Sequence, residues 1–158
     1  MKIFVAFVHL AFATTWLGGA FFYVVILQPR LNTLPAVERR AMARSLRATM
    51  TPLLAISALL TIASGLVMMV QLHSQHPGSF SHSRWGLALI IGALASLGAL
   101  AIAFAIEAPA VRRGTGLEQA SGQAKDLARL TRRVLSARLV ALALLLVALA
   151  TMAVARYS

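Results

Sequence analysis

Apolar residues gather in four long runs along this chain. The runs cover residues 3–27, 52–72, 85–106 and 134–155. About 20 apolar residues in an α-helix cross the roughly 30 Å hydrocarbon layer of a bilayer, and each run is at least that long. Helices buried in water-soluble proteins rarely reach this length without a polar face. The pattern predicts an all-α integral membrane protein, a single four-helix bundle over residues 1–158.

The first run also has features of a secretory signal peptide. Lys2 precedes it, and Ala11, Phe12 and Ala13 match the small-residue pattern of a cleavage site. The run continues to Leu27, about twice the length of a typical signal core. We therefore interpret this segment as a membrane helix.

The basic residues indicate which side of the membrane each loop faces. Loops one and three are rich in arginine, whereas the middle loop, residues 73–84, contains Arg84 alone. Because Lys and Arg accumulate in cytoplasmic loops, we expect both termini and loop 73–84 to lie outside. The basic residues of the two inner loops are Arg30, Arg39, Arg40, Arg44, Arg47, Arg112, Arg113, Lys125, Arg129, Arg132 and Arg133.

Composition agrees with this topology. The net charge is +11 and 59% of the residues are apolar. The anionic inner leaflet attracts such basic loops, so we expect the lipid bilayer as a partner and no nucleic acid. The chain has no cysteine, which excludes disulfides, thiolate metal sites and a cysteine nucleophile.

Both inner loops have the spacing of helices. In the first, Thr33 suits a helix cap and Pro35 a first turn, while Pro52 is expected to restart or kink the helix at the membrane surface. Helical spacing from residue 117 to 131 predicts that the fourth helix begins inside the cytoplasm. We therefore expect basic cytoplasmic helix extensions, either solvated or forming a docking surface.

His9 is the residue singled out within the apolar runs. It lies about 9 Å below the outer surface, and His9, Trp16 and Tyr23 are spaced to share one stripe of their helix. An ionisable residue within a membrane span usually faces the bundle interior. Three interpretations stay open: a histidine hydrogen-bonded to a neighbouring helix, a metal or haem ligand, and a proton relay.

Sulfur and imidazole groups are expected in the same outer half. The second helix runs outward, which brings Met68, Met69 and His73 there. Imidazole and thioether groups bind haem iron and Cu(I). The candidate cofactor site is therefore His9 with Met68, Met69 or His73 and with Trp16 beside it, although each methionine also suits simple packing.

Two further patterns concern the outer loop and the third helix. His73, His76 and His82 could gather Cu(II) or Zn(II), or could cluster by chance in a polar loop. Small residues four apart, Gly92 with Ser96 and Ala95 with Ala99 and Ala103, predict close helix packing within the bundle or toward a second copy.

A family resemblance is carried by His9, Trp16-Leu17-Gly18-Gly19 and Pro29-Arg30-Leu31. This segment resembles the first helix of CopD-like copper-resistance domains and HemJ-type protoporphyrinogen oxidases, small four-helix proteins of the bacterial inner membrane. The resemblance implies a four-helix bundle and, for the HemJ type, a b-type haem with His9 as a functional residue. Gly92 stands where these families commonly carry a lysine, which argues against the oxidase activity.

Three functions follow from these observations. The first is an electron-transfer protein that binds a b-type haem. If this protein is an enzyme, it is a haem-dependent oxidoreductase. The second is a copper-handling transport protein, and the third is a non-catalytic subunit or scaffold of a larger membrane complex or homo-oligomer. The motifs of soluble enzymes, such as a phosphate loop or a nucleophile elbow, are missing, so no catalytic residue is assigned.

Overall fold

The computed structural model describes residues 2–75, 83–107, 109 and 124–155. Its helices are α1 (Lys2–Phe21), η1 (Phe22–Leu27), α2 (Gln28–Asn32), α3 (Ala36–Gln75), α4 (Arg84–Ile102), η2 (Ala103–Glu107) and α6 (Ala124–Ala155), where η marks a π-helix. Four continuous stretches are long and apolar enough to cross a membrane: Lys2–Asn32, Ala36–Gln75, Arg84–Ile106 and Arg129–Ala155. The described residues contain no strand. The prediction of an all-α bundle of four membrane-spanning helices is confirmed.

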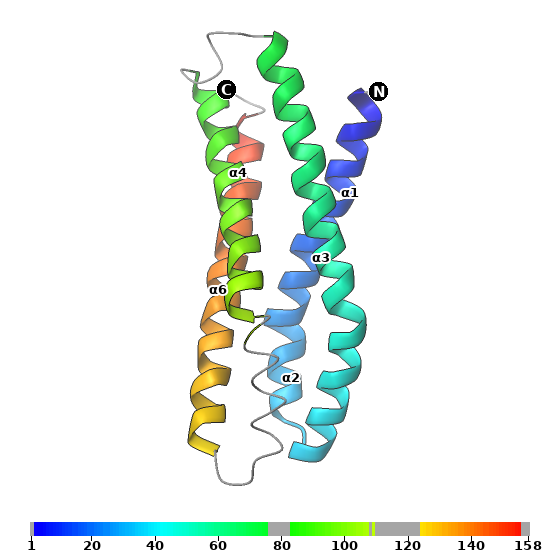
Figure 1. Cartoon of the computed structure of the whole chain (residues 1–158), viewed down its shortest axis with the longest axis vertical. Helices are drawn as coiled ribbons and strands as arrows, with labels where there is room; N and C mark the ends of the chain where they lie inside the picture. The colour runs from blue at the N-terminus through cyan, green and yellow to red at the C-terminus, as the bar shows by residue number, and fades with distance from the viewer. Residues whose placement is uncertain (1, 76–82, 108, 110–123, 156–158) are drawn as a thin grey trace.

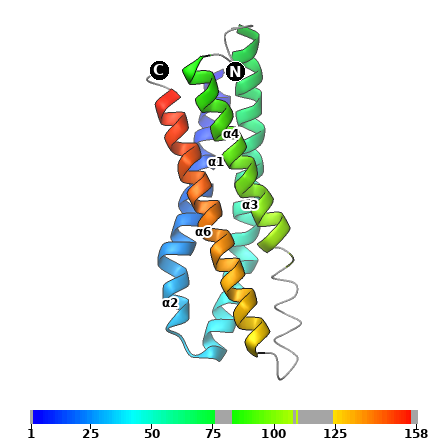
Figure 2. The ribbon, with the colours of Figure 1, turned by 90° about the vertical axis from the view of Figure 1, so that its left-hand side faces the viewer.

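The long helices form two antiparallel pairs that stand side by side (Figures 1 and 2). α1 packs along α3 and α4 packs along α6, whereas contacts between the two pairs are much sparser. We call the pairs the α1/α3 hairpin and the α4/α6 hairpin. The start of α1 and the end of α6 share one end of the bundle, and α2 lies at the other end (Figure 1). We call the first the outer end and the second the inner end, because the charge rule predicts that the second faces the cytoplasm.

The inner extensions are helical, with two corrections to the sequence prediction. α3 continues through Pro52 and does not restart there. Thr33 ends α2 and does not cap α3, because its hydroxyl donates a hydrogen bond of 2.8 Å to the carbonyl of Arg30. α6 begins at Ala124, well before its apolar run, as predicted. Residues 117–123 lie outside the described part of the chain.

Two of the spans widen into π-helical turns in the inner half of the bundle. η1 is followed two residues later by Pro29, and η2 is followed two residues later by Pro109. Proline has no N–H and its ring crowds the carbonyl four residues earlier, so the preceding turn opens. Single π-helical turns are frequent at functional sites. Both segments contribute side chains to the same cavity.

The core takes one residue from each long helix. Trp16, Ala58, Ala99 and Leu145 pack together, so the large indole of α1 is accommodated by alanines on α3 and α4. On α4 the small residues Gly86, Gly92, Ala95, Ser96 and Ala99 are buried, which confirms the predicted packing face. Most large apolar side chains instead face outward, as they do when lipid is the solvent.

Candidate functional site

His9 lies in the outer half of the bundle and contacts α3. Its Nδ1 atom is 2.9 Å from the carbonyl oxygen of Thr61 and 3.2 Å from the Oγ atom of Ser64. The ring also packs against Gly65, where an added Cβ atom would lie 3.0 Å from the His9 Cε1 atom. His9 is therefore hydrogen-bonded to a neighbouring helix, and its roles as a cofactor ligand or proton relay stay predictions.

These contacts determine which nitrogen of His9 carries a hydrogen atom. A carbonyl oxygen can only accept, so Nδ1–H donates to Thr61. The Ser64 hydroxyl donates to the carbonyls of Leu60 and Thr61, and its lone pairs are therefore available to Nδ1–H as well. In the neutral ring Nε2 then keeps its lone pair, the arrangement found in histidines that bind metals. His9 is therefore equipped to supply one ligand.

The other predicted ligands lie farther out along α3 than the residues that contact His9. Met68 and Met69 begin one turn beyond Ser64, about 6 Å farther out along α3, and Met68 is 36% exposed. His73 lies nine residues beyond Ser64, about 13 Å along the helix, so His9 and His73 do not form one site.

The predicted surface metal site is only partly covered by the structure. Among the described residues, no group of three or more metal-binding side chains gathers. His73 is exposed near the end of α3, and His76 and His82 lie outside the described residues. The metal site of the outer loop therefore stays a prediction.

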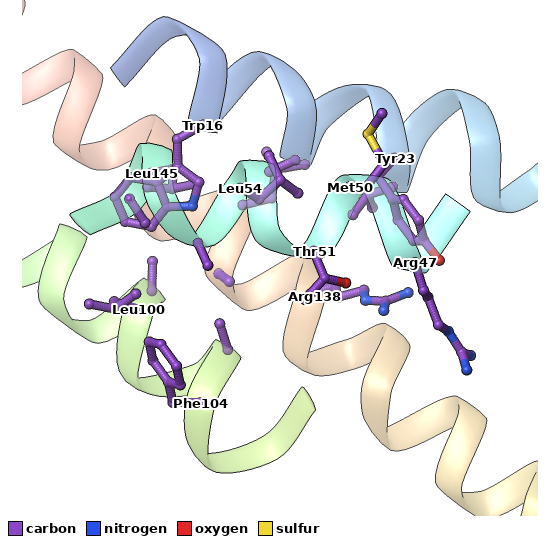
Figure 3. A pocket seen from close by; sticks show the side chains of 18 residues that line it. Trp16, Tyr23, Arg47, Met50, Thr51, Leu54, Leu100, Phe104, Arg138 and Leu145 are labelled. Atoms are coloured by element: carbon purple, nitrogen blue, oxygen red, sulfur yellow. The ribbon is translucent and has the colours of Figure 1, made fainter. Parts of the chain in front are cut away.

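A cavity of about 350 Å³ lies in the inner half of the bundle, between the two hairpins (Figure 3). Trp16 and Leu145 lie at one end of it, and Leu100 of α4 and Phe104 of η2 form part of its wall. The space exists because many of the facing residues are small. Its lining includes Ala20, Ala55, Ala58, Ala99, Ala103 and Ala141.

Polar groups converge at the inner end of this cavity. The Arg138 guanidinium carbon lies 4.5 Å from the centre of the Tyr23 ring, a cation–π contact. Arg138 Nη1 also donates a 3.3 Å hydrogen bond to the side-chain oxygen of Gln28. Arg47 extends from α3 at the same end, and its buried Nε atom has no hydrogen-bond partner among the described residues (Figure 3).

The residues of the predicted stripe, His9, Trp16 and Tyr23, therefore lie in two different environments. Trp16 and Tyr23 line the cavity, whereas His9 does not. Trp16 lies seven residues inward of His9, about 10 Å along the helix. It is a core residue, only 8% exposed, and it does not share the contacts of His9 with α3.

Sequence reasoning missed the inner cavity and its arginines. Arg47 was assigned to a solvated helix extension, and Arg138 was not among the predicted site residues although it lies within the fourth apolar run. A charged side chain inside a membrane span is costly and marks a functional site by default, so Arg138 carried a usable signal. Pro29 and Pro109 were a second signal, because each follows a π-helical turn that contributes side chains to the cavity.

The arrangement has the chemistry of a binding site for an amphipathic molecule: apolar walls and cationic groups confined to one end. No family model, curated protein or solved structure matches this chain.

Proposed function

We propose that this chain binds a small amphipathic molecule within the inner half of the membrane. The observation that carries the proposal is the cavity between the two hairpins, whose volume of about 350 Å³ falls within the range of ligand sites. Its walls are apolar and its polar groups lie at one end, so it suits a molecule with an apolar body and one polar head group.

The packing of the bundle supports the same proposal. The hairpins are closely packed internally and make few contacts with each other. Helices in a membrane are held together by packing and polar contacts, because lipid is as apolar as their side chains. A molecule in the cavity contacts all four long helices and fills the sparsely packed space between the hairpins.

Quenching of tryptophan fluorescence tests this proposal. The chain has two tryptophans, and Trp85→Phe leaves Trp16, which lines the cavity and is shielded from the bilayer. The probe is a twelve-carbon alkyl amphiphile brominated in its chain, added to this variant in nanodiscs of zwitterionic lipid. We expect saturable quenching of Trp16, because bromine quenches only at close range and the cavity gives the chain access.

Two substitutions on α6 provide a matched pair. Ala141 lines the cavity, whereas Ala143, on the same helix, is exposed. We expect Ala141→Phe to fill the cavity and remove the saturable quenching, and Ala143→Phe to leave it intact. Equal quenching in the two variants, or none in either and none in the parent, contradicts the proposed function.

A second candidate is a b-type haem bound by His9, an electron-transfer role. The observation in its favour is the Nδ1–H donation to Thr61, which leaves Nε2 of His9 with its lone pair. The described residues around His9 provide one axial ligand for haem iron, the imidazole of His9 itself. Haem iron supplies one-electron redox chemistry, and the same lone pair suits copper, as in the copper-handling alternative.

Visible absorbance of the purified protein decides this second candidate. If His9 is an axial ligand, protein expressed with added haem has a Soret band that His9→Ala removes, and Ser64→Ala, which keeps the Thr61 hydrogen bond, retains the band. Copper found by elemental analysis, lost in His9→Ala, favours the copper reading instead. A protein with neither cofactor contradicts both.

A further inference from the structure

The inner end of the cavity combines two arginines from different hairpins. Arg47 comes from α3 and Arg138 comes from α6, and both line the cavity (Figure 3). Of the lining residues that the structure describes, these two carry a positive charge and none carries a negative charge. The cavity is therefore electrostatically one-sided, apolar toward Trp16 and cationic toward the inner membrane surface.

The Arg47 side chain has a buried hydrogen-bond donor for which the described residues provide no acceptor. Its Nε atom is buried, and no described residue accepts a hydrogen bond from it. A buried donor of a charged group that lacks an acceptor is costly, and the cost is removed when an oxygen atom is bound. The chain has only four carboxylates against fifteen Lys and Arg, so an acceptor from within the protein is scarce.

Arg138 is positioned by its neighbours. The Tyr23 ring lies against its guanidinium plane, and the Gln28 amide oxygen accepts from Nη1. A guanidinium presents five N–H donors in a rigid fork, a geometry suited to the paired oxygens of a carboxylate or phosphate. The π-helical turn η1 carries Tyr23, so the distortion before Pro29 serves to place this group.

The size of the cavity limits the apolar part of the ligand. A cavity of about 150 Å³ holds one benzene molecule. By proportion, about 350 Å³ accommodates roughly a dozen carbon atoms. This matches one alkyl chain of moderate length and is too small for both chains of a membrane phospholipid.

We infer that the ligand is a single-chain amphiphile with an oxyanion head group, a carboxylate or phosphate, whose oxygens bind Arg47 and Arg138 together. The inference rests on the proposed function, since it names the class of molecule that the cavity takes. The chain extends toward Trp16, and the head group links the α1/α3 hairpin to the α4/α6 hairpin. The anion thereby stabilises a contact that the protein's own side chains leave sparse.

The experiment compares two probes with the same brominated twelve-carbon chain. One is the carboxylate, brominated dodecanoate, and the other is the neutral brominated dodecyl maltoside. Both are titrated into the variant that retains Trp16 as its single tryptophan, in zwitterionic nanodiscs. We expect the carboxylate to bind about tenfold more tightly, the gain typical of one charge-assisted hydrogen bond.

Substitution of the arginines tests whether Arg47 and Arg138 cause the difference in affinity between the two probes. Arg47→Gln and Arg138→Gln should each remove most of the preference for the carboxylate over the maltoside. Arg44→Gln is the matched control, because Arg44 is an exposed arginine one turn from Arg47 on α3. It should leave both affinities as they are.

Further outcomes separate the inference from the proposed function. Equal affinity for the two probes, with binding still removed by Ala141→Phe, overturns the inference and leaves the cavity as a binding site. Absence of binding by either probe overturns the proposed function itself. Displacement of the dodecanoate by phosphatidylglycerol added to the nanodiscs contradicts a single-chain ligand, because it assigns the arginines to bulk anionic lipid.

Thermal unfolding tests the link between the hairpins. The dodecanoate should raise the melting temperature of the parent protein, because a ligand that binds only the folded state stabilises it by mass action. The same concentration should give a smaller rise in Arg47→Gln and in Arg138→Gln. An equal rise in all three proteins would contradict the bridging role.

Discussion

Gly65 is the residue that allows His9 to reach α3. A Cβ atom at this position would lie 3.0 Å from Cε1 and 3.3 Å from Nδ1 of the imidazole. Nδ1 is also the atom that bonds to Thr61, so the ring cannot move away from α3 without lengthening that hydrogen bond. The close packing of His9 on α3 thus depends on the absence of a side chain at Gly65.

Gly65→Ala should therefore destabilise the protein although alanine is the better helix former. Overpacking of this kind typically costs about 1–3 kcal/mol. Gly18→Ala is the control, because nothing lies within 4 Å of a Cβ atom there. The free energies of unfolding, measured by titration with SDS in mixed micelles, should differ by about 1–3 kcal/mol in favour of Gly18→Ala. Equal values would show that the His9 ring shifts without cost.

Ser57 is the opposite case, a polar residue that lacks a partner. It is 0% exposed, and its Oγ atom makes no hydrogen bond among the described residues. An unsatisfied buried hydroxyl costs about 1–3 kcal/mol, so Ser57→Ala should raise the free energy of unfolding by about 1 kcal/mol. Ser96→Ala, which removes a buried hydroxyl bonded to the Gly92 carbonyl at 2.9 Å, should not. A loss of stability in Ser57→Ala would mean that the hydroxyl has a partner within the membrane.

At the scale of elements, α4 packs closely against α6 at two glycines of α4. A Cβ atom on Gly92 would lie 2.8 Å from the Thr151 hydroxyl oxygen, and that hydroxyl donates to the carbonyl of Ala148. A Cβ atom on Gly98 would lie 3.3 Å from a methyl group of Leu144, at the flexible end of a longer side chain. The helices are therefore less able to adapt at Gly92 than at Gly98.

Gly92→Ala should cost about 1–3 kcal/mol of unfolding free energy, and Gly98→Ala should cost less. Because the obstacle at Gly92 is the Thr151 hydroxyl, the double variant Gly92→Ala with Thr151→Ala should recover most of the loss. Thermal melting in detergent measures all three. If the double variant is no more stable than Gly92→Ala alone, the contact with the α6 backbone limits the packing instead.

The helices could be predicted from the sequence because each depends only on its own residues. Four apolar runs of sufficient length suffice for that, and the small residues around Gly92 and Ser96 predict the α4 packing face. The cavity could not be predicted in the same way. It depends on which faces of four helices meet, so that Ala58 and Ala99 come opposite Trp16 and leave room beyond it.

The same reasoning explains why the predicted cofactor site and the observed cavity differ. His9 was an obvious polar residue in an apolar run, and its contact with another helix was predicted. The contribution of Arg47 required knowledge that α3 continues through Pro52 and brings this arginine to the same cavity as Arg138 of the other hairpin. The widening at η1, which brings Tyr23 to Arg138, is a backbone response to Pro29 that hydrophobic periodicity does not describe.

At the scale of the whole molecule, the basic residues are distributed unequally between the two ends of the bundle. Among the described residues, Lys2 and Arg84 lie toward the outer end. The remaining described arginines outside the cavity lie toward the inner end: Arg30, Arg39, Arg40, Arg44, Arg129, Arg132 and Arg133. The cavity arginines lie on the same side as this basic group. If the predicted orientation holds, the proposed anionic amphiphile of the inner leaflet meets a positive surface before it meets Arg47 and Arg138.

This unequal distribution of basic residues predicts that the inner end faces the cytoplasm. Because the chain contains no cysteine, single cysteines can be introduced to test the topology directly. Ser74→Cys places a single thiol near the outer end of α3, and Ser45→Cys places one on the inner part of the same helix; both serines are exposed. A membrane-impermeant maleimide should label the Ser74 variant in intact cells, and the Ser45 variant only after the membrane is opened. Both thiols should react in detergent, which controls for their reactivity. Labelling of the Ser45 variant alone in intact cells would invert the topology and would place the cavity, with its arginines, in the outer leaflet.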